Sequence, residues 1–260
     1  MTTLAHTLAD SRTMLHRQLL HLRRYPSLTV MLIGLPVIFL LLFVYVFGGT
    51  LGAGIGGGRA AYVNYLTPGI LLFTVAGVAT GTAVSVAMDM TEGIVDRFRS
   101  LAIARSALLT GHVLGSLVQN LLALAAVLGV ALLAGFRPDA TPLEWLAALG
   151  VLTATAFALT WFAVALGMVA DSVETASNTP MFLSLLPFLG SGFVPTQTMP
   201  AGLRTFAEYQ PFTPIIETLR GLLLGSGIGT AAVTALAWCA GISLLSYLWA
   251  RRRYRRRATA

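Results

Sequence analysis

Six stretches of this 260-residue chain contain no Asp, Glu, Lys or Arg and are rich in apolar side chains. An ionisable side chain at the centre of a bilayer costs about 2.5–3.5 kcal/mol even on the milder insertion scale, so uncharged runs mark membrane spans. Most of the runs exceed the roughly 20 residues that an α-helix needs to cross the hydrocarbon layer. We therefore predict six transmembrane helices, at residues 27–47, 65–88, 108–134, 145–170, 176–194 and 228–249. The fifth run is shorter and contains Pro180 and Pro187, which disfavour a continuous helix.

The composition agrees with an integral membrane protein. Hydrophobic residues make up 56% of the chain and charged residues only 10%, whereas soluble domains are about a quarter charged. We predict an all-α integral membrane fold, in which residues 27–250 form the transmembrane domain. Residues 1–26 precede it, and an Arg-rich tail, 251–260, follows it.

The arginines predict the orientation, because basic residues collect in short cytoplasmic loops. With both termini inside, 13 of the 17 basic residues lie on the cytoplasmic side. The opposite orientation would reverse this ratio, so we expect both termini in the cytoplasm. The Arg-rich tail then anchors on anionic lipid, and nucleic-acid binding is not expected, because no folded basic domain accompanies it.

The first predicted cytoplasmic loop, residues 89–107, carries a cluster of charges between two apolar runs. Ile94, Phe98 and Leu101 have the spacing of one helical face, so this segment is expected to form a helix at the membrane surface. Periodicity leaves two interpretations open. The helix is either a solvated element anchored by its arginines or a docking surface for a cytoplasmic partner.

Two further amphipathic segments flank the spans. Residues 1–26 contain a leucine stripe with helical period, which indicates an interfacial helix that anchors the chain or contacts a cytoplasmic partner. On the predicted outer side, residues 195–227 again present one apolar face, so this segment is expected to lie on the membrane or to dip partway into it. That face consists of Ile215, Ile216, Leu219, Leu222 and Leu223.

Several apparent motifs fail on inspection. Gly52, Gly54 and Gly57 have dinucleotide-binding spacing, but they follow a predicted span instead of a strand, so we interpret them as a flexible loop. The chain has no lysine, which excludes a P-loop and ATP hydrolysis by that route. His112 has no second histidine or carboxylate at metal-ligand spacing, so packing or hydrogen bonding at the interface is expected. We predict no catalytic, cofactor or metal residue on this chain.

The charge-free spans also argue against a proton- or sodium-coupled transporter, which usually holds ionisable groups inside its bundle. The chain thus has the features of a transport bundle that lacks its own energy source. Two alternatives from other classes stay open: an ATP-independent channel or secondary transporter, and a membrane immunity or structural protein.

Residues 92–101, followed by Ala104, Arg105 and Gly111, resemble the daunorubicin-resistance-type permeases of the ABC-2 family. The region before the last span is similar as well, through Phe193-Val194-Pro195, Met199-Pro200, Gln210-Pro211 and Arg220-Gly221-Leu222. This resemblance implies a non-catalytic permease in a bacterial plasma membrane. It would form a homodimer or heterodimer and bind a separate ABC ATPase subunit, which would hold ATP and Mg.

The resemblance also implies roles for individual residues. The loop 89–107 would contain the coupling helix, and the residues expected to contact the ATPase are Glu92, Gly93, Asp96, Arg97, Phe98 and Arg99. Substrate would pass between two permease copies, along the second and fifth spans. We expect Phe73, Thr74, Phe182 and Phe188 to line this path. The implied substrate is an amphipathic drug, antibiotic or lipid-like molecule, which is exported from the cell.

Overall fold

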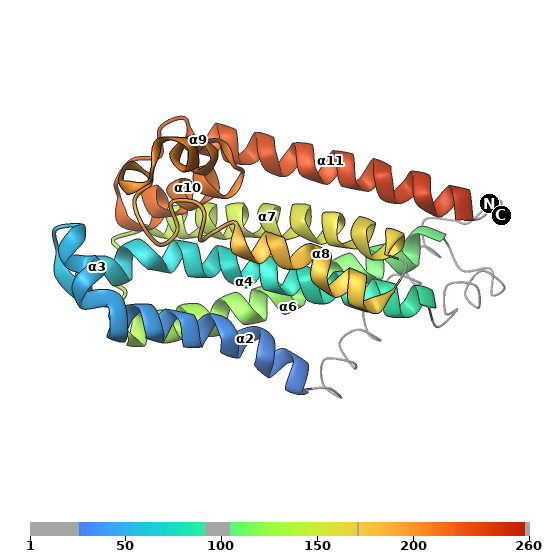
Figure 1. Cartoon of the computed structure of the whole chain (residues 1–260), viewed down its shortest axis with the longest axis horizontal. Helices are drawn as coiled ribbons and strands as arrows, with labels where there is room; N and C mark the ends of the chain where they lie inside the picture. The colour runs from blue at the N-terminus through green and yellow to red at the C-terminus, as the bar shows by residue number, and fades with distance from the viewer. Residues whose placement is uncertain (1–25, 92–104, 171, 258–260) are drawn as a thin grey trace.

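The computed structural model describes residues 26–91, 105–170 and 172–257, and every regular element in these ranges is helical. The helices form an elongated bundle in which most of them run along the long axis (Figure 1). Short helices α3, α9 and α10 gather at one end of this bundle, together with the start of α11. In chain order the elements are α2 (Pro26–Leu41), η1 (Leu42–Phe47), α3 (Gly48–Gly54), α4 (Gly58–Thr91), α6 (Arg105–Leu133), α7 (Pro142–Val169), α8 (Val173–Leu185), η2 (Thr196–Thr198), α9 (Ala201–Tyr209), α10 (Phe212–Leu224) and α11 (Ala231–Arg257).

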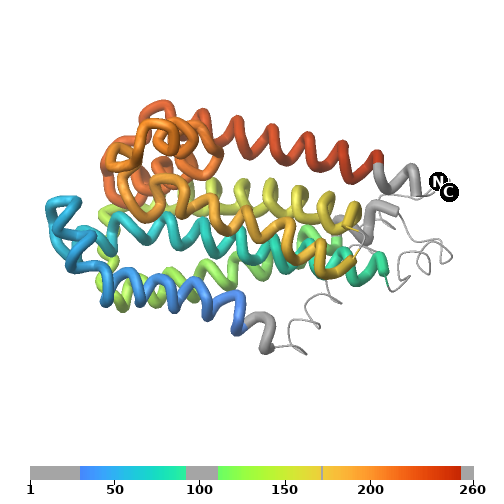
Figure 2. The backbone as a smooth tube through the Cα atoms, in the orientation of Figure 1, coloured from blue at the N-terminus to red at the C-terminus, as the bar shows by residue number. Residues whose placement is uncertain are grey.

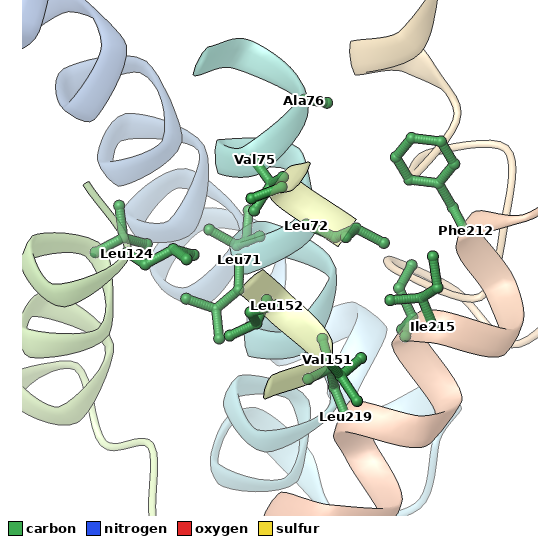
Figure 3. Close-up of a cluster of buried hydrophobic side chains, with 14 of the residues drawn as sticks. Leu71, Leu72, Val75, Ala76, Leu124, Val151, Leu152, Phe212, Ile215 and Leu219 are labelled. Atoms are coloured by element: carbon green, nitrogen blue, oxygen red, sulfur yellow. The ribbon is translucent and has the colours of Figure 1, made fainter. Parts of the chain in front are cut away.

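Helix α4 is the central element of the bundle. It contacts α2, α3, α6, α7, α8 and α10, and it is the most buried of the long apolar helices. Its side chains pack against those of its neighbours in a continuous apolar core, which Figure 3 shows in part. The labelled residues include Leu71 and Leu72 of α4, Leu152 of α7 and Ile215 of α10. In contrast, α2 and α11 expose long apolar faces, which suits contact with lipid.

Five helical stretches of the described residues are long and apolar enough to cross a membrane. They correspond to five of the six predicted spans and are Val30–Gly54, Gly58–Thr91, Gly111–Leu133, Pro142–Val169 and Ala231–Arg252. The predicted count of six is not confirmed. In the fifth range, α8 has only 13 residues, and residues 186–194 form turns. A helix of this length rises about 20 Å, which is short of the hydrocarbon thickness.

The prediction of a flexible glycine loop at Gly52, Gly54 and Gly57 was wrong for Gly52 and Gly54, because both belong to helix α3, whereas Gly57 lies in the connection that follows it. The first span continues through the π-helix η1 into α3 before the chain reverses into α4. At Gly52 a Cβ atom would collide with the backbone of Gly58. Glycine therefore serves here for close packing of two helices, and the reversal itself occurs at Gly56 and Gly58, which have positive φ.

Side-chain caps explain two helix starts. Thr141 and Glu144 form a capping box at the start of α7, with Pro142 at the first helical position. This box adds one turn before the predicted start at Trp145. Ser172 caps α8 through the backbone N–H of Thr175 at 3.2 Å.

Several of the long helices begin or finish at the same end of the bundle. The end of α4, the end of α7 and the start of α8 lie toward the same end (Figure 2). The start of α6 and the Arg-rich end of α11 lie at this end too (Figure 1). Short connections on the opposite end lead into α4, α7 and α11. We call the end with the Arg-rich part of α11 the basic end. Its assignment to the cytoplasm stays a prediction from the arginine distribution.

Candidate functional site

The predicted ATPase contacts lie outside the described residues. These are Glu92, Gly93, Asp96, Arg97, Phe98 and Arg99. The elements on either side of them are described. Helix α4 ends at Thr91 and α6 begins at Arg105, and both of these helix ends lie at the basic end of the bundle (Figure 1).

A hydrogen bond between two buried side chains connects these two helices close to the segment. His112 Nε2 lies 3.0 Å from Asp89 Oδ2, and both residues are less than one tenth exposed. Of the two expected roles of His112, packing or hydrogen bonding, the structure shows a hydrogen bond between buried side chains. Its partner could not be identified from sequence, because the two residues are 23 positions apart and meet only when α4 and α6 pack together. Asp89 was not singled out as a functional residue by sequence reasoning.

Further polar contacts follow along the same face of α6. Ser116 Oγ lies 2.7 Å from Thr82 Oγ1 of α4 and 3.2 Å from Thr160 Oγ1 of α7. Asn120 donates to the Ser116 carbonyl at 3.1 Å. We refer to the six residues as the polar ladder, and all of them are buried: Thr82, Asp89, His112, Ser116, Asn120 and Thr160.

Aromatic rings form a second cluster, between the first span, α4 and the turns after α8. Phe188 stacks on Phe193 with ring centroids 4.0 Å apart, and it meets the ring edge of Phe73 at 5.4 Å. Phe39 contacts Phe73 at 5.3 Å, and Phe43 contacts Phe193 at 4.9 Å. Phe43 belongs to the π-helix η1, a helix type that often occurs at functional sites because it shifts the register of side chains. We call these five phenylalanines the aromatic cluster.

The structure separates the four residues of the predicted substrate path. Phe73 and Phe188 belong to the aromatic cluster. Thr74 is fully buried and donates to the Ile70 carbonyl at 2.8 Å. Phe182 lies on the outer face of α8 with 71% of its surface exposed. In a single copy of the chain Phe182 is thus exposed, Phe188 is partly exposed, and Phe73 and Thr74 are buried. The role of all four residues stays a prediction.

Residues 186–194, which we call the outer turn, are fixed by side chains of α4 and α10. Tyr62 donates to the Phe193 carbonyl at 3.1 Å, and Tyr65 donates to the Ser191 carbonyl at 2.9 Å. Arg220 Nη2 donates to the Ser191 carbonyl at 2.8 Å and to the Tyr65 carbonyl at 3.2 Å. The guanidinium carbon of Arg220 also lies 3.8 Å from the centroid of the Tyr65 ring. Gly69 lets α4 approach the outer turn closely, because a Cβ atom on Gly69 would lie only 2.5 Å from the Gly192 oxygen.

Arg220 also lines a groove at the surface. The groove has a volume of about 620 Å³ and is bordered by Glu217 and by the glycine-rich connection between α10 and α11. Burial lowers the pKa of the Arg220 guanidinium, while Tyr65 and Glu217 oppose this shift. Arginine nevertheless stays protonated in proteins, so the side chain places a permanent positive charge behind the outer turn.

The chain is similar in sequence to a known family and to several known proteins. The model of the ABC-2 type transporter family matches residues 10–224. The chain is 32% identical over 225 residues to the daunorubicin resistance ABC transporter permease protein DrrB1 of Streptomyces coeruleorubidus, and this alignment covers 85% of the chain and 78% of that protein. It is 25% identical over 187 residues to the probable doxorubicin resistance ABC transporter permease protein DrrC of Mycobacterium tuberculosis, with coverages of 70% and 66%. A third relative, ABC transporter G family member 20 of Dictyostelium discoideum, is 27% identical over 200 residues, which are 74% of this chain but 26% of that protein.

Proposed function

The chain belongs to the ABC-2 type transporter family, and from this premise we propose that it is the permease subunit of an exporter driven by a separate ABC ATPase subunit. The family match over residues 10–224, together with the similarity to a daunorubicin resistance permease over most of both chains, carries this proposal. The absence of lysine supports it, because the chain has no P-loop and requires a partner to hydrolyse ATP. ATP and Mg would bind to that partner.

The proposed mechanism uses the segment between α4 and α6 as the coupling element. Closure of the ATPase subunits around ATP would push this segment on each of two permease copies, in a homodimer or a heterodimer. Packed helices respond to such a push by small sliding motions, and the bundle would switch between inward and outward access. This requires residues 92–99 to lie in the cytoplasm, in agreement with the arginine distribution.

The proposed substrate is an amphipathic drug, an antibiotic or a lipid-like molecule. The names of two relatives contain daunorubicin and doxorubicin, and aromatic side chains are suited to contacts with molecules that carry flat rings. We place the substrate between two permease copies, in contact with the exposed Phe182. Membrane lipid would surround the remaining apolar faces.

Copurification tests this proposal most directly. The tagged protein is extracted from its native membrane in mild detergent, and proteins that copurify in comparable amounts are identified by mass spectrometry. We expect an ABC ATPase at a near-equal molar ratio. Its reproducible absence, with the permease intact, would contradict the proposal and favour a channel, a secondary transporter or an immunity protein.

Reversing the charge of Glu92 is expected to abolish export. Glu92→Arg would place a cation where the family resemblance predicts a contact with the ATPase, and like charges at such an interface cost several kcal/mol. Export of a fluorescent drug from cells measures the effect, and membrane insertion should not change. Glu174→Arg provides the control, because Glu174 is exposed at the start of α8, near the same end of the bundle. Normal export by Glu92→Arg would refute the coupling role.

Truncation of Phe182 is expected to weaken substrate binding without affecting the fold. The side chain is 71% exposed, so Phe182→Ala removes little core packing. Loss of an aromatic contact in a binding site should raise the KM for a fluorescent amphipathic drug about tenfold. Phe157→Ala is the matched control, since Phe157 is an exposed aromatic residue of α7. An equal KM in the two variants would remove Phe182 from the substrate path.

A further inference from the structure

The polar ladder links three helices of the bundle through hydrogen bonds between their side chains. His112, Ser116 and Asn120 recur at every fourth position of α6 and therefore share one helix face. Two of them bond to other helices: His112 to Asp89 of α4, and Ser116 to Thr82 of α4 and Thr160 of α7. These bonds cross helix interfaces deep inside the bundle. Polar groups in such a setting hold helices in one register, because sliding would leave them without partners in an apolar environment.

Close backbone packing reinforces this connection between α4 and α7. A Cβ atom on Gly167 of α7 would lie 2.5 Å from the Ala83 oxygen and 3.0 Å from the Val86 Cβ of α4. Ala83 directly follows the ladder residue Thr82, and Val86 lies between Thr82 and Asp89. Hydrogen bonds therefore join α6 to α4 and α7, and α4 and α7 also pack closely against each other at Gly167.

The hydrogen-bonded pair Asp89 and His112 lies beside the proposed coupling segment. Asp89 is within the last turn of α4, which ends at Thr91, and His112 is within the second or third turn of α6, which begins at Arg105. The chain between these helices contains the residues that we propose to contact the ATPase. If the two helix ends were not joined, a push on that chain would move each of them independently.

We infer that Asp89 and His112 are positioning residues that join the helices flanking the coupling segment, so that a push by the ATPase moves α4, α6 and α7 as one unit. This inference rests on the proposed coupling role of residues 92–99. In this inference the contact between Asp89 and His112 makes α4 and α6 move together. The contact of Ser116 with Thr160 then carries the motion to α7. The pair does not contact ATP and is not expected to contact substrate.

The inference predicts uncoupling without loss of the ATPase. In the reconstituted complex, Asp89→Ala and His112→Ala should retain the bound ATPase and its basal rate of hydrolysis. The amount of drug transported per ATP hydrolysed should fall about tenfold, as expected for mutations within a coupling network. The exchanged variant, with both Asp89→His and His112→Asp, re-forms the pair in the opposite direction and should recover most of this ratio.

Controls separate coupling from folding. Thr155→Val removes another buried hydroxyl of α7, which bonds to the Val151 carbonyl and faces Cys239 of α11 outside the ladder, and it should leave the transport ratio unchanged. Ser116→Ala adds no volume and is the substitute if the Asp89 and His112 variants fail to fold. It should lower the ratio about threefold.

The outcomes distinguish the two proposals. An unchanged transport ratio in the folded single variants, or in Ser116→Ala where those variants do not fold, would overturn the positioning role. Failure of the exchanged variant to recover the ratio would overturn it too. If the wild-type chain bound no ATPase, the proposed function itself would fail before any variant was compared.

Discussion

Replacing Gly69 with alanine is expected to destabilise the protein more than the same replacement at Gly77 or Gly81 of α4. The new Cβ would lie 2.5 Å from the oxygen and 2.8 Å from the Cα of Gly192. Both are backbone atoms of the outer turn, so no side-chain rotation relieves the overlap. Overpacking of this kind costs about 1–3 kcal/mol, which for a chain of this size corresponds to a fall in melting temperature of roughly 2–12 °C.

Gly77→Ala is the matched control for this prediction. Gly77 lies in the same helix, and a Cβ there would meet nothing within 4 Å. Because alanine has the higher helix propensity, this variant should be neutral or slightly more stable, by up to about 1 kcal/mol. Thermal unfolding of the two variants in the same detergent, followed by fluorescence-detected size exclusion, measures the difference. Equal melting temperatures would show that the outer turn does not pack against α4 as described.

The long spans could be predicted from sequence, because the cost of charge inside a bilayer leaves a signal that extends over many residues. The structure of residues 176–194 was harder to predict, since hydropathy reports apolar composition and does not show where a helix ends in a turn. Pro187, Gly190 and Gly192 indicate a break within this run. Their consequence, a turn held against α4, depends on Tyr65 and Arg220, which are distant in sequence.

The candidate functional residues also differ in how far the sequence alone could predict them. The coupling segment was predicted from its local motif and its alternation of charged and apolar residues, which are properties of one continuous stretch, and its role stays a prediction. The Asp89–His112 pair and the contact of Ser116 with Thr160 join positions that are far apart in the chain. Only the packing of α4, α6 and α7 brings them together, so no spacing rule could have indicated them. The sequence indicated only that His112 packs or forms a hydrogen bond, without identifying Asp89 as its partner.

Loss of the Arg220 guanidinium is expected to release the outer turn. Arg220→Met keeps an apolar side chain of similar reach, but it removes the hydrogen bonds to the carbonyls of Ser191 and Tyr65 and the contact with the Tyr65 ring. Hydrogen bonds from a charged donor contribute about 1.5–3 kcal/mol, and a cation–π contact adds about 0.5–2 kcal/mol. Relief of the desolvation cost of the buried charge offsets part of this loss. We therefore expect a net destabilisation of about 2–3 kcal/mol, concentrated in the outer turn.

Hydrogen exchange measures this local effect directly. Backbone amides of residues 186–194 should exchange at least about tenfold faster in Arg220→Met, because opening of the turn no longer breaks these contacts. Arg220→Lys should restore only part of the protection, since an ammonium group lacks the planar fork of the guanidinium and stacks less well on tyrosine. Arg204→Met is the control, because Arg204 forms an exposed ion pair with Glu208, and such pairs contribute less than about 1 kcal/mol. Equal exchange of the outer turn in the wild type and in Arg220→Met would show that Tyr62, Tyr65 and the contact of Gly69 with Gly192 hold it without the arginine.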